Sequence, residues 1–415
     1  MCHRAGSVSQ RERQRRMHIR HILPEPEQGV LPLDPLNGAL TGLLSVAFNL
    51  ALLQARAGHR VEIIAPSEDS RAHRADVEGV AIRWLPLWNR ARFPRYDLRL
   101  FLPLLIDNLR APSADIHHVH NNPYLLIHRR ARAAVMQFHN PPLRGSSTHD
   151  VFMRRAGRAI CCSGYIKERV AAEVNYPAGQ LVTIHNGIHA DAFQAIEPAH
   201  ARQQFGIDPD AFVVLFSGRI VPEKGFHVLL KAWQQVLQAR PGRNLVLAAA
   251  GSTRLGLGTP QHLSDDRFNA EFSALSAYER DVEQLAATIP PERIRFLGSL
   301  NREAIRAFYR AGDVFVCPST WEEPFGLVNA EAMAAGLPVI ASDAGGIPEI
   351  VQHEQNGLLV PKDDADALAN AILRLVDDAD ARRRMTTQGL AYVRRFDWSE
   401  IARQIEAVYE ACLHR

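Results

Sequence analysis

Residues 213–238 read VVLFSGRIVPEKGFHVLLKAWQQVLQ, which is a strand, a turn and a helix in succession. The stretch starts with a continuous apolar run of strand length, turns through Gly and Pro residues, and ends with apolar residues at helical spacing. This order of elements builds parallel α/β domains. The cations Arg219 and Lys224 lie in the turn, just after the strand, where such domains bind their ligands.

The same unit recurs on both sides of this stretch. After it, apolar strands are predicted at 245–250, 294–297, 314–317 and 338–342. Before it, strands are predicted at 17–23, 61–65, 116–119, 134–138 and 158–162, with an amphipathic helix from Thr41 to Ala57 after the first. Short apolar strands separated by helices indicate parallel sheets covered on both faces. The pattern restarts near 187–198, so we predict two Rossmann-like domains joined there and facing each other across a cleft.

Composition narrows the class of protein. The 415 residues suffice for two domains, and the net charge of +3 is too small to indicate nucleic-acid binding. No apolar run approaches the ~20 residues of a membrane span. The five cysteines lack metal-site spacing, and Cys161 and Cys317 end apolar strands as buried thiols would. A reduced cytoplasm fits this pattern.

Two segments each allow two interpretations, one structural and one functional. Residues 1–16 carry five arginines without the apolar core of a secretory signal. They form either a disordered leader, with Met17 as the start, or a basic arm that rests on anionic lipid. Residues 88–110 mix Arg with aromatic and aliphatic residues, as in an amphipathic helix packed on the first sheet or in a face toward membrane or acceptor lipid. We therefore expect a cytoplasmic protein, with the inner face of the plasma membrane as a peripheral contact.

The segment CPSTWEEPFGLVNAE (317–331) contains two candidate binding carboxylates. A helix should begin near Phe325 or Gly326, which places Glu323 just before it and Glu331 about two turns inside. Exposed amides at a helix start bind anions and hydroxyls, and a carboxylate deeper on the helix can accept the vicinal hydroxyls of a ribose. Equally, an N-cap carboxylate and a solvent-facing glutamate would give the same two residues.

The turn residues Arg219 and Lys224 can hold a diphosphate, or they can be two solvated loop cations. Asn37-Gly38 opens the loop after the first strand, where a glycine lets a phosphate or sugar approach the backbone, although Asn-Gly is also a common turn dipeptide.

Histidines and aspartates are the remaining candidates. His117, His118 and His120 resemble a metal cluster but have no acidic or cysteine partner nearby in the sequence, so we favour structural roles. His139 directly follows a strand and should point toward the cleft, as either a site residue or a core histidine. The aspartates near the C-terminus are expected to be helix caps and solvated residues, and no metal is assigned; they are Asp363, Asp364, Asp366, Asp377, Asp378 and Asp380.

Taken together, these motifs resemble those of glycosyltransferase family 4, whose members retain anomeric configuration and have the GT-B fold. The resemblance is carried by Glu323-x7-Glu331 with its EPFG start and by GRIVPEKG (218–225). HNGI (185–188), PVIASDAGGIPEIV (338–351) and NGLLVP (356–361) add to it. It is looser over 17–184, where the first loop has Asn37-Gly38 in place of the family's double glycine.

The resemblance implies a role for each residue of the donor site. Arg219 and Lys224 would contact the donor diphosphate, Glu331 the ribose and Glu323 the transferred sugar. Backbone groups would bind the rest of the donor: those at Ser299 and Leu300 the base, and the amides of Phe325, Gly326 and Leu327 the sugar and phosphate. From the N-terminal domain, Gly38 would approach the phosphate and His139 the reacting sugar.

The resemblance also implies an organisation of the chain. A basic leader (1–16) would precede an acceptor-side domain (17–190) and a nucleotide-sugar-binding domain (191–391). A C-terminal helix (392–415) would cross back to the first domain. Residues 252–280 form a polar insertion without an assigned role.

The expected activity is metal-independent transfer of a hexose or N-acetylhexosamine from a nucleotide-sugar, with a UDP-sugar favoured over a GDP- or ADP-sugar. The acceptor would be a glycan or lipid-linked sugar of cell-surface polysaccharide or lipopolysaccharide synthesis. The alternatives are another GT-B enzyme, such as a nucleotide-sugar epimerase or a phosphorylase, and a two-lobed sugar-binding protein. The expected mechanism is front-face displacement, in which the leaving diphosphate helps to deprotonate the acceptor and Glu323 positions the sugar.

Overall fold

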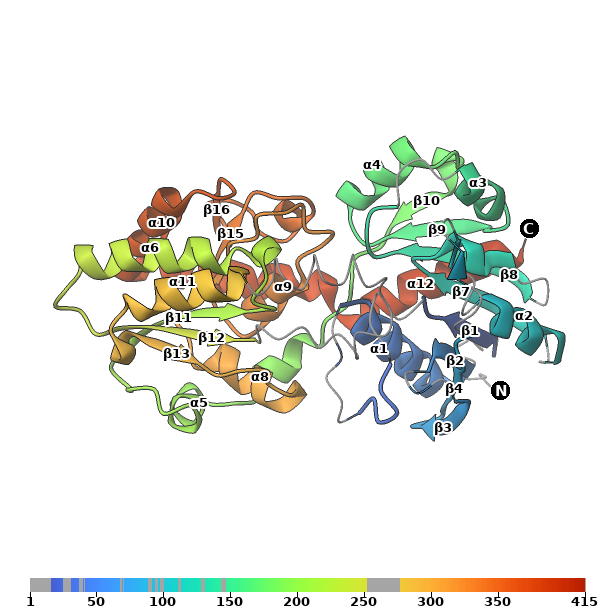
Figure 1. Ribbon diagram of the computed structural model, residues 1–415, viewed down its shortest axis with the longest axis horizontal. Coiled ribbons are helices and arrows are strands. Elements are labelled where there is room, and N and C mark those ends of the chain that lie inside the picture. The colour runs from blue at the N-terminus through green and yellow to red at the C-terminus, as the bar shows by residue number, and fades with distance from the viewer. Residues whose placement is uncertain are drawn as a thin grey trace, which may run out of the picture.

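A computed structural model describes residues 16–24, 31–36, 40, 42–67, 69, 71–88, 92–93, 96–97, 101–110, 113–127, 131–142, 147–251 and 277–414. The basic residues 1–15, Asn37-Gly38 and most of the insertion (252–276) lie outside these ranges. The described chain forms two α/β domains that lie side by side (Figure 1). The predicted fold class, two domains with parallel sheets, is confirmed.

The first domain contains an eight-stranded sheet in the order β10-β9-β8-β7-β1-β2-β4-β3. All neighbours are parallel except β3 and β4, which form an antiparallel edge. Its strands are β1 (His18–Ile22), β2 (Arg60–Pro66), β3 (His73–Val77), β4 (Val80–Leu85), β7 (Ala114–His120), β8 (Ala131–Phe138), β9 (Arg158–Cys161) and β10 (Leu181–Thr183). Its helices are α1 (Gly42–Arg56), α2 (Phe101–Arg110), α3 (Ser147–Met153) and α4 (Gly164–Glu173), and a separate short pair is formed by β5 (Arg92–Phe93) and β6 (Tyr96–Asp97).

The second domain contains a six-stranded, wholly parallel sheet in the order β13-β12-β11-β14-β15-β16. Its strands are β11 (Phe212–Ser217), β12 (Leu245–Ala250), β13 (Ile294–Phe296), β14 (Val314–Cys317), β15 (Val339–Ser342) and β16 (Gly357–Val360). Its helices are α5 (Pro198–Gln204), α6 (Phe226–Ala239), α8 (Arg302–Arg310), α9 (Leu327–Ala334), α10 (Ala365–Asp377) and α11 (Ala379–Val393), with a further helical stretch at 277–287.

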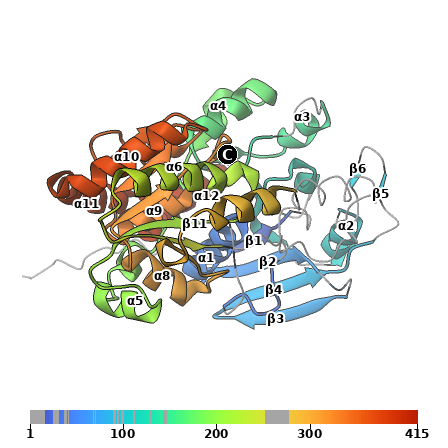
Figure 2. The ribbon, with the colours of Figure 1, turned by 60° about the vertical axis from the view of Figure 1, so that its left-hand side comes forward.

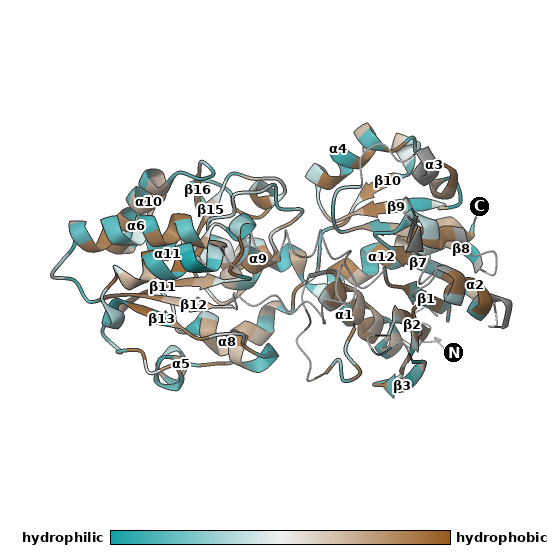
Figure 3. Ribbon diagram, viewed as in Figure 1, coloured by the Kyte–Doolittle hydropathy of each residue, from teal (hydrophilic) through white to brown (hydrophobic). Residues whose placement is uncertain are grey.

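The inner strands of the second sheet contribute side chains to two cores, as β11 illustrates. Val214 and Phe216 pack with α6 and α10 on one face, whereas Val213 and Leu215 belong to the core on the other face. Successive residues of a strand point to opposite faces, so a sheet covered on both sides needs continuous apolar strands. Hydrophobic residues accordingly mark most strands of both sheets, and hydrophilic residues mark the outer helix α11 (Figure 3).

The chain crosses between the domains twice. The first crossing lies between β10, the last strand of the first sheet, and α5, which packs on α8. After α11 the chain returns as α12 (Trp398–Leu413), which packs against β8 and α1 of the first domain (Figures 1 and 2). Trp398, Ile401 and Tyr409 of α12 complete a core with residues of β1, β7 and β8.

The region 88–110 contains a packed helix. Leu104 of α2 is fully buried in the first domain's core, and Arg83 of β4 pairs with Asp107. Burial of this face supports the interpretation of 101–110 as an amphipathic helix on the first sheet. Among the described helices, none is long and apolar enough to cross a membrane.

Candidate active site

Lys224 and Glu323 meet where two strands of the second sheet end. The turn η6 (Pro222–Lys224) follows β11, and Gly225 after it has φ +66°. A Cβ atom on Gly225 would lie 1.8 Å from the Pro318 carbonyl oxygen, so only glycine allows this close contact with the loop after β14. The contact brings Lys224 Nζ within 2.6 Å of Glu323 Oε1.

The Glu323 residue is held from several sides. Its Oε1 also accepts a hydrogen bond from Ser319 Oγ at 2.7 Å. Its carbonyl accepts from the Gly346 amide at 2.7 Å. The loop that supplies this amide turns at Gly345, where φ is +57° and a Cβ would lie 2.2 Å from the Glu323 carbonyl oxygen. The buried carboxylate therefore has a fixed place beside an ammonium group, as positioning of a substrate requires.

Arg219 is the second predicted cation of this edge. It follows β11, is exposed, and has no hydrogen bond or ion pair within the described part of the chain. Lys224 is paired with Glu323, whereas the guanidinium of Arg219 has no such partner among the described residues. A guanidinium without a protein partner is suited to bidentate binding of a phosphate.

The loop after β13 lies on the same edge of the sheet. Hydrogen bonds from the Gly218 amide to the Ala250 carbonyl and from the Gly251 amide to the Gly298 carbonyl link the ends of β11, β12 and β13. Ser299, which is exposed, and Leu300 therefore follow a strand end two strands away from Arg219.

The helix predicted near Phe325 or Gly326 begins at Leu327, because Gly326 adopts φ +84° and acts as the N-cap of α9. No side chain caps this helix end, so the amides of its first turn are not satisfied by a capping group. The start of α9 follows Glu323 by four residues and thus belongs to the same site.

Glu331 lies on α9, where the Tyr309 hydroxyl donates to its Oε2 at 3.1 Å. Burial raises the pKa of Glu331 to about 7, although Tyr309 and the cations Arg306 and Arg302 act in the opposite direction. Desolvation outweighs these partners because a charged carboxylate loses its water in this position. The carboxyl group consequently exchanges its proton near neutral pH, which is typical of binding and catalytic sites.

His139 approaches the same site from the first domain. It follows β8, and its amide donates to Asn121 Oδ1 at 2.7 Å. The thiol of Cys162 lies 3.7 Å from both the His139 carbonyl and the Pro324 carbonyl. The Ser163 hydroxyl donates to the same Pro324 carbonyl at 2.5 Å. Cys162 thus bridges the backbone of His139 to Pro324 in the EPFG segment of the other domain.

Glu349 is a contact between the domains that the sequence reasoning did not identify. The turn η9 (Ile347–Glu349) places its carboxylate at the start of α4 in the first domain. The amides of Gly164 and Tyr165 donate to it at 2.9 and 3.0 Å, and His185 Nε2 lies 2.9 Å away. These hydrogen bonds lower the pKa of Glu349 against the effect of its burial. The motif PVIASDAGGIPEIV therefore contributes to the domain interface.

Other predicted residues have structural roles. Asp364 and Asp378 are N-caps, accepting from the Ala367 and Ala381 amides at 2.8 Å each. Three of the other aspartates bond to neighbouring side chains: Asp366 to Gln235, Asp377 to Arg240 and Asp380 to Arg383. The four described cysteines are buried, and Cys161, Cys162 and Cys317 are free thiols. His117, His118 and His120 are buried in β7, where His118 and His120 meet His21, a residue that the sequence reasoning did not group with them.

Comparisons with known proteins assign the two domains. Residues 40–192 match the family model of Glycosyltransferase Family 4, and residues 199–391 match that of Glycosyl transferases group 1. A D-inositol 3-phosphate glycosyltransferase of Streptomyces scabiei is 32% identical over 263 residues, covering 60% of this chain and 54% of that protein. The chain spans about half the length of the curated relatives it matches.

Solved structures share the fold over nearly the whole chain. HepE of Anabaena, in complex with UDP and glucose, has a TM-score of 0.71 at 22% identity and covers 95% of this chain and 100% of that one. The catalytic domain of starch synthase IV from Arabidopsis thaliana, bound to ADP and acarbose, has a TM-score of 0.68 at 18% identity and covers 97% and 100%. With both domains matched and the fold shared, the chain belongs to glycosyltransferase family 4 and has the GT-B fold.

Proposed function

We propose that this protein transfers a sugar from a nucleotide-sugar donor to a hydroxyl acceptor with retention of anomeric configuration. The observation that carries the proposal is the Lys224–Glu323 pair in the same loop region as Arg219, which has no partner among the residues that the structure describes. Loss of a nucleoside diphosphate builds up negative charge, which preorganised cations stabilise most effectively. A carboxylate beside these cations can accept hydrogen bonds from the hydroxyl groups of the sugar while it stays in its place.

In the proposed arrangement, Arg219 and Lys224 bind the diphosphate, and Glu323 holds the transferred sugar. Glu331 accepts the ribose hydroxyls, and the loop at Ser299 and Leu300 meets the base. The amides at the start of α9, from Phe325 to Leu327, hold sugar and phosphate. Gly38 approaches the phosphate from the first domain, and His139 lies beside the reacting sugar.

The proposed mechanism is a front-face displacement. The departing diphosphate accepts the proton of the attacking hydroxyl, which approaches from the same face that the diphosphate leaves, so configuration is retained. Arg219 and Lys224 lower the energy of the developing charge and make a divalent ion unnecessary. Turnover should therefore persist in EDTA.

The donor and acceptor are proposed more specifically on family grounds. The structural relative HepE was solved with UDP and glucose, which supports a UDP-hexose or UDP-N-acetylhexosamine, whereas the starch synthase relative bound ADP. We propose a glycan or lipid-linked acceptor of cell-surface polysaccharide or lipopolysaccharide synthesis, used in the cytoplasm at the inner face of the membrane. The basic residues 1–15 that would contact anionic lipid lie outside the described residues.

The test is a screen of UDP-, GDP- and ADP-sugars for release of the nucleoside diphosphate, followed by the Lys224→Met variant. Removing one preorganised donor at a developing charge should lower kcat by about 10²–10³. Lys231→Met is the matched control, because this exposed lysine lies on α6 away from the loop. Undiminished kcat in Lys224→Met would refute the diphosphate role, and epimerisation without release would indicate a different GT-B activity.

A further inference from the structure

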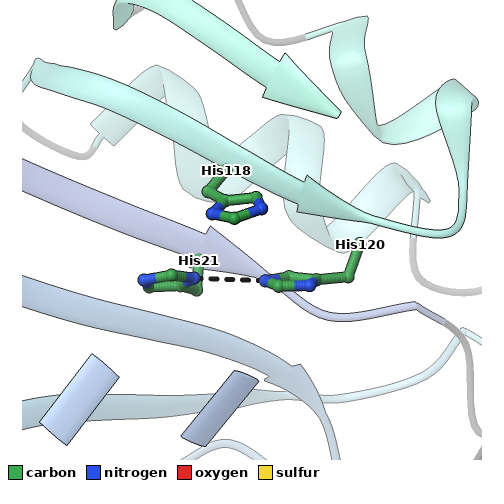
Figure 4. A group of neighbouring side chains, drawn as sticks. All are labelled: His21, His118 and His120. Atoms are coloured by element: carbon green, nitrogen blue, oxygen red, sulfur yellow. Dashed lines mark hydrogen bonds between the residues drawn. The ribbon is translucent and has the colours of Figure 1, made fainter. Parts of the chain in front are cut away.

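A chain of buried polar side chains runs behind His139 through the middle of the first domain. His139 Nε2 lies 2.9 Å from His120 Nδ1, and His120 Nε2 lies 3.1 Å from His21 Nδ1. His21 is on β1 and His120 on β7, and Figure 4 shows the bond between them. His21 Nε2 in turn lies 2.8 Å from Oε1 of Gln54, on α1.

The chain continues into the C-terminal helix. Gln54 Nε2 donates to the Tyr409 hydroxyl of α12 at 3.2 Å, and this hydroxyl lies 2.6 Å from His118 Nδ1. His139 is 6% exposed. The other members are fully buried, namely His120, His21, Gln54, Tyr409 and His118. The chain thus connects the proposed sugar site to the last helix of the protein.

The hydrogen bonds of this chain all run in one direction. Burial lowers the pKa of His21 to about 4 and that of His139 to about 3, so the imidazoles are neutral, and each has one donor nitrogen and one acceptor nitrogen. Gln54 Oε1 only accepts, so His21 Nε2 carries the proton and His21 Nδ1 accepts from His120 Nε2. His120 Nδ1 then accepts from His139 Nε2. This leaves His139 Nδ1 without a proton.

The orientation of the Gln54 amide decides this direction. A reversed amide would donate to His21 and would invert every bond as far as His139. In the present orientation Gln54 Nε2 donates to the Tyr409 hydroxyl, which leaves the hydroxyl proton available to His118 Nδ1. The Gln54 amide is therefore coupled to the tautomer of His139 through three hydrogen bonds.

Metal binding is the alternative role for three of these histidines. One ligand atom of each of His21, His118 and His120 lies within 4.8 Å of the others. However, the His118 and His120 rings are stacked, with 15° between their planes and 4.4 Å between centroids (Figure 4). A coordinated metal lies close to the plane of each imidazole, and two nearly parallel, separated planes do not meet at bonding distance. The ring arrangement favours hydrogen bonding.

We propose that Gln54 and Tyr409 are positioning residues that keep His139 protonated on Nε2, so that its Nδ1 accepts a hydrogen bond from a hydroxyl of the donor sugar. This inference rests on the proposed function. His139 Nδ1 is buried and has no hydrogen-bond partner among the described residues. A buried acceptor of this kind normally has a partner, and a sugar hydroxyl bound next to Glu323 would supply it.

The tautomer is tested by long-range ¹H–¹⁵N spectra of the full chain labelled with ¹⁵N-histidine, with His139 assigned through His139→Gln. We expect a single Nε2–H tautomer for His139. Gln54→Leu removes the acceptor and should give a mixture of tautomers, whereas Gln54→Glu restores an acceptor and should restore the single form. Tyr409→Phe preserves packing, frees the Gln54 amide to reverse, and provides a second variant if Gln54→Leu does not fold.

Kinetics with UDP-glucose link the tautomer to the reaction. In Gln54→Leu and Tyr409→Phe we expect kcat to fall about tenfold, as for loss of one buried hydrogen bond, with recovery in Gln54→Glu. His59→Gln is the matched control. His59 is buried beside Glu406, which lies on α12 as Tyr409 does, but it is not part of the hydrogen-bonded chain. An Nδ1–H tautomer of His139 in the wild type, unchanged kcat in both variants, or stoichiometric zinc in the purified protein would overturn the inference. Absence of turnover with every nucleotide-sugar would instead refute the proposed function, while the spectra would still decide the tautomer.

Discussion

Replacing Glu331 with glutamine should stabilise the unliganded protein and weaken its binding of nucleotide. Burial raises the pKa of Glu331 from 4.5 to about 7. The folded protein therefore keeps a proton that the unfolded chain releases between these pH values, so the free energy of unfolding falls as pH rises through this window. At about 1.4 kcal/mol per pKa unit, the ionised carboxyl costs up to about 3 kcal/mol above pH 7. Glutamine is neutral at every pH and can keep the bond from Tyr309.

The assay is urea unfolding of wild type and Glu331→Gln between pH 5 and pH 8. The stabilisation should be below about 1 kcal/mol at pH 5 and should grow to about 3 kcal/mol at pH 8. Glu303→Gln is the matched control, since Glu303 is an exposed glutamate on the neighbouring helix α8. Parallel pH dependences for wild type and Glu331→Gln would refute the raised pKa.

Calorimetric titration with UDP at pH 8 tests the second half of this prediction. Loss of a charged acceptor for the ribose hydroxyls should raise Kd by roughly 10- to 100-fold, equivalent to about 1.5–3 kcal/mol. Binding to the wild type near pH 7 should also release protons, because the hydroxyls favour the ionised carboxylate. An unchanged Kd in the variant would show that Glu331 does not hold the ribose.

Three further substitutions test separate parts of the structure. Arg219→Gln should leave the free energy of unfolding within about 0.5 kcal/mol, because this residue has no partner in the described chain, but should raise the Kd for UDP about tenfold; an unchanged Kd would remove its role. Glu349→Ala removes the acceptor for the amides of Gly164 and Tyr165 and should increase the radius of gyration in small-angle scattering, whereas an unchanged radius would mean that other contacts hold the domains. Asp364→Ala removes the N-cap of α10 and should cost about 1 kcal/mol in urea unfolding, and no loss would contradict its capping role.

The sequence predicted those parts of the fold that depend on local apolar runs. The strands expected at 213–217 and 245–250 correspond closely to β11 and β12, since buried parallel strands are apolar on both faces. The edge strand β3 was missed because its sequence, HRADV, is polar and no residue of it is buried. The strand β16 was assigned only as part of a family motif.

Local sequence patterns also predicted only part of the candidate site. Glu323, Lys224 and Arg219 were predictable because residues that follow parallel strands gather at one edge of a sheet. The hydrogen-bonded chain behind His139 was not predictable, because Gln54 and Tyr409 are 355 residues apart in the sequence. Each lies among buried, mostly apolar residues of its own helix, and only tertiary packing shows that the two side chains meet.

The return of α12 to the first domain has a consequence for the order of folding. The core formed by β1, β7 and β8 lacks Trp398, Ile405 and Tyr409 until the residues of α12 have been synthesised. The first domain made by the ribosome is therefore finished last, and its exposed apolar face must wait while the whole second domain emerges. At about 5–20 residues per second, that interval is on the order of ten to forty seconds, a window in which a chaperone could bind the unfinished surface.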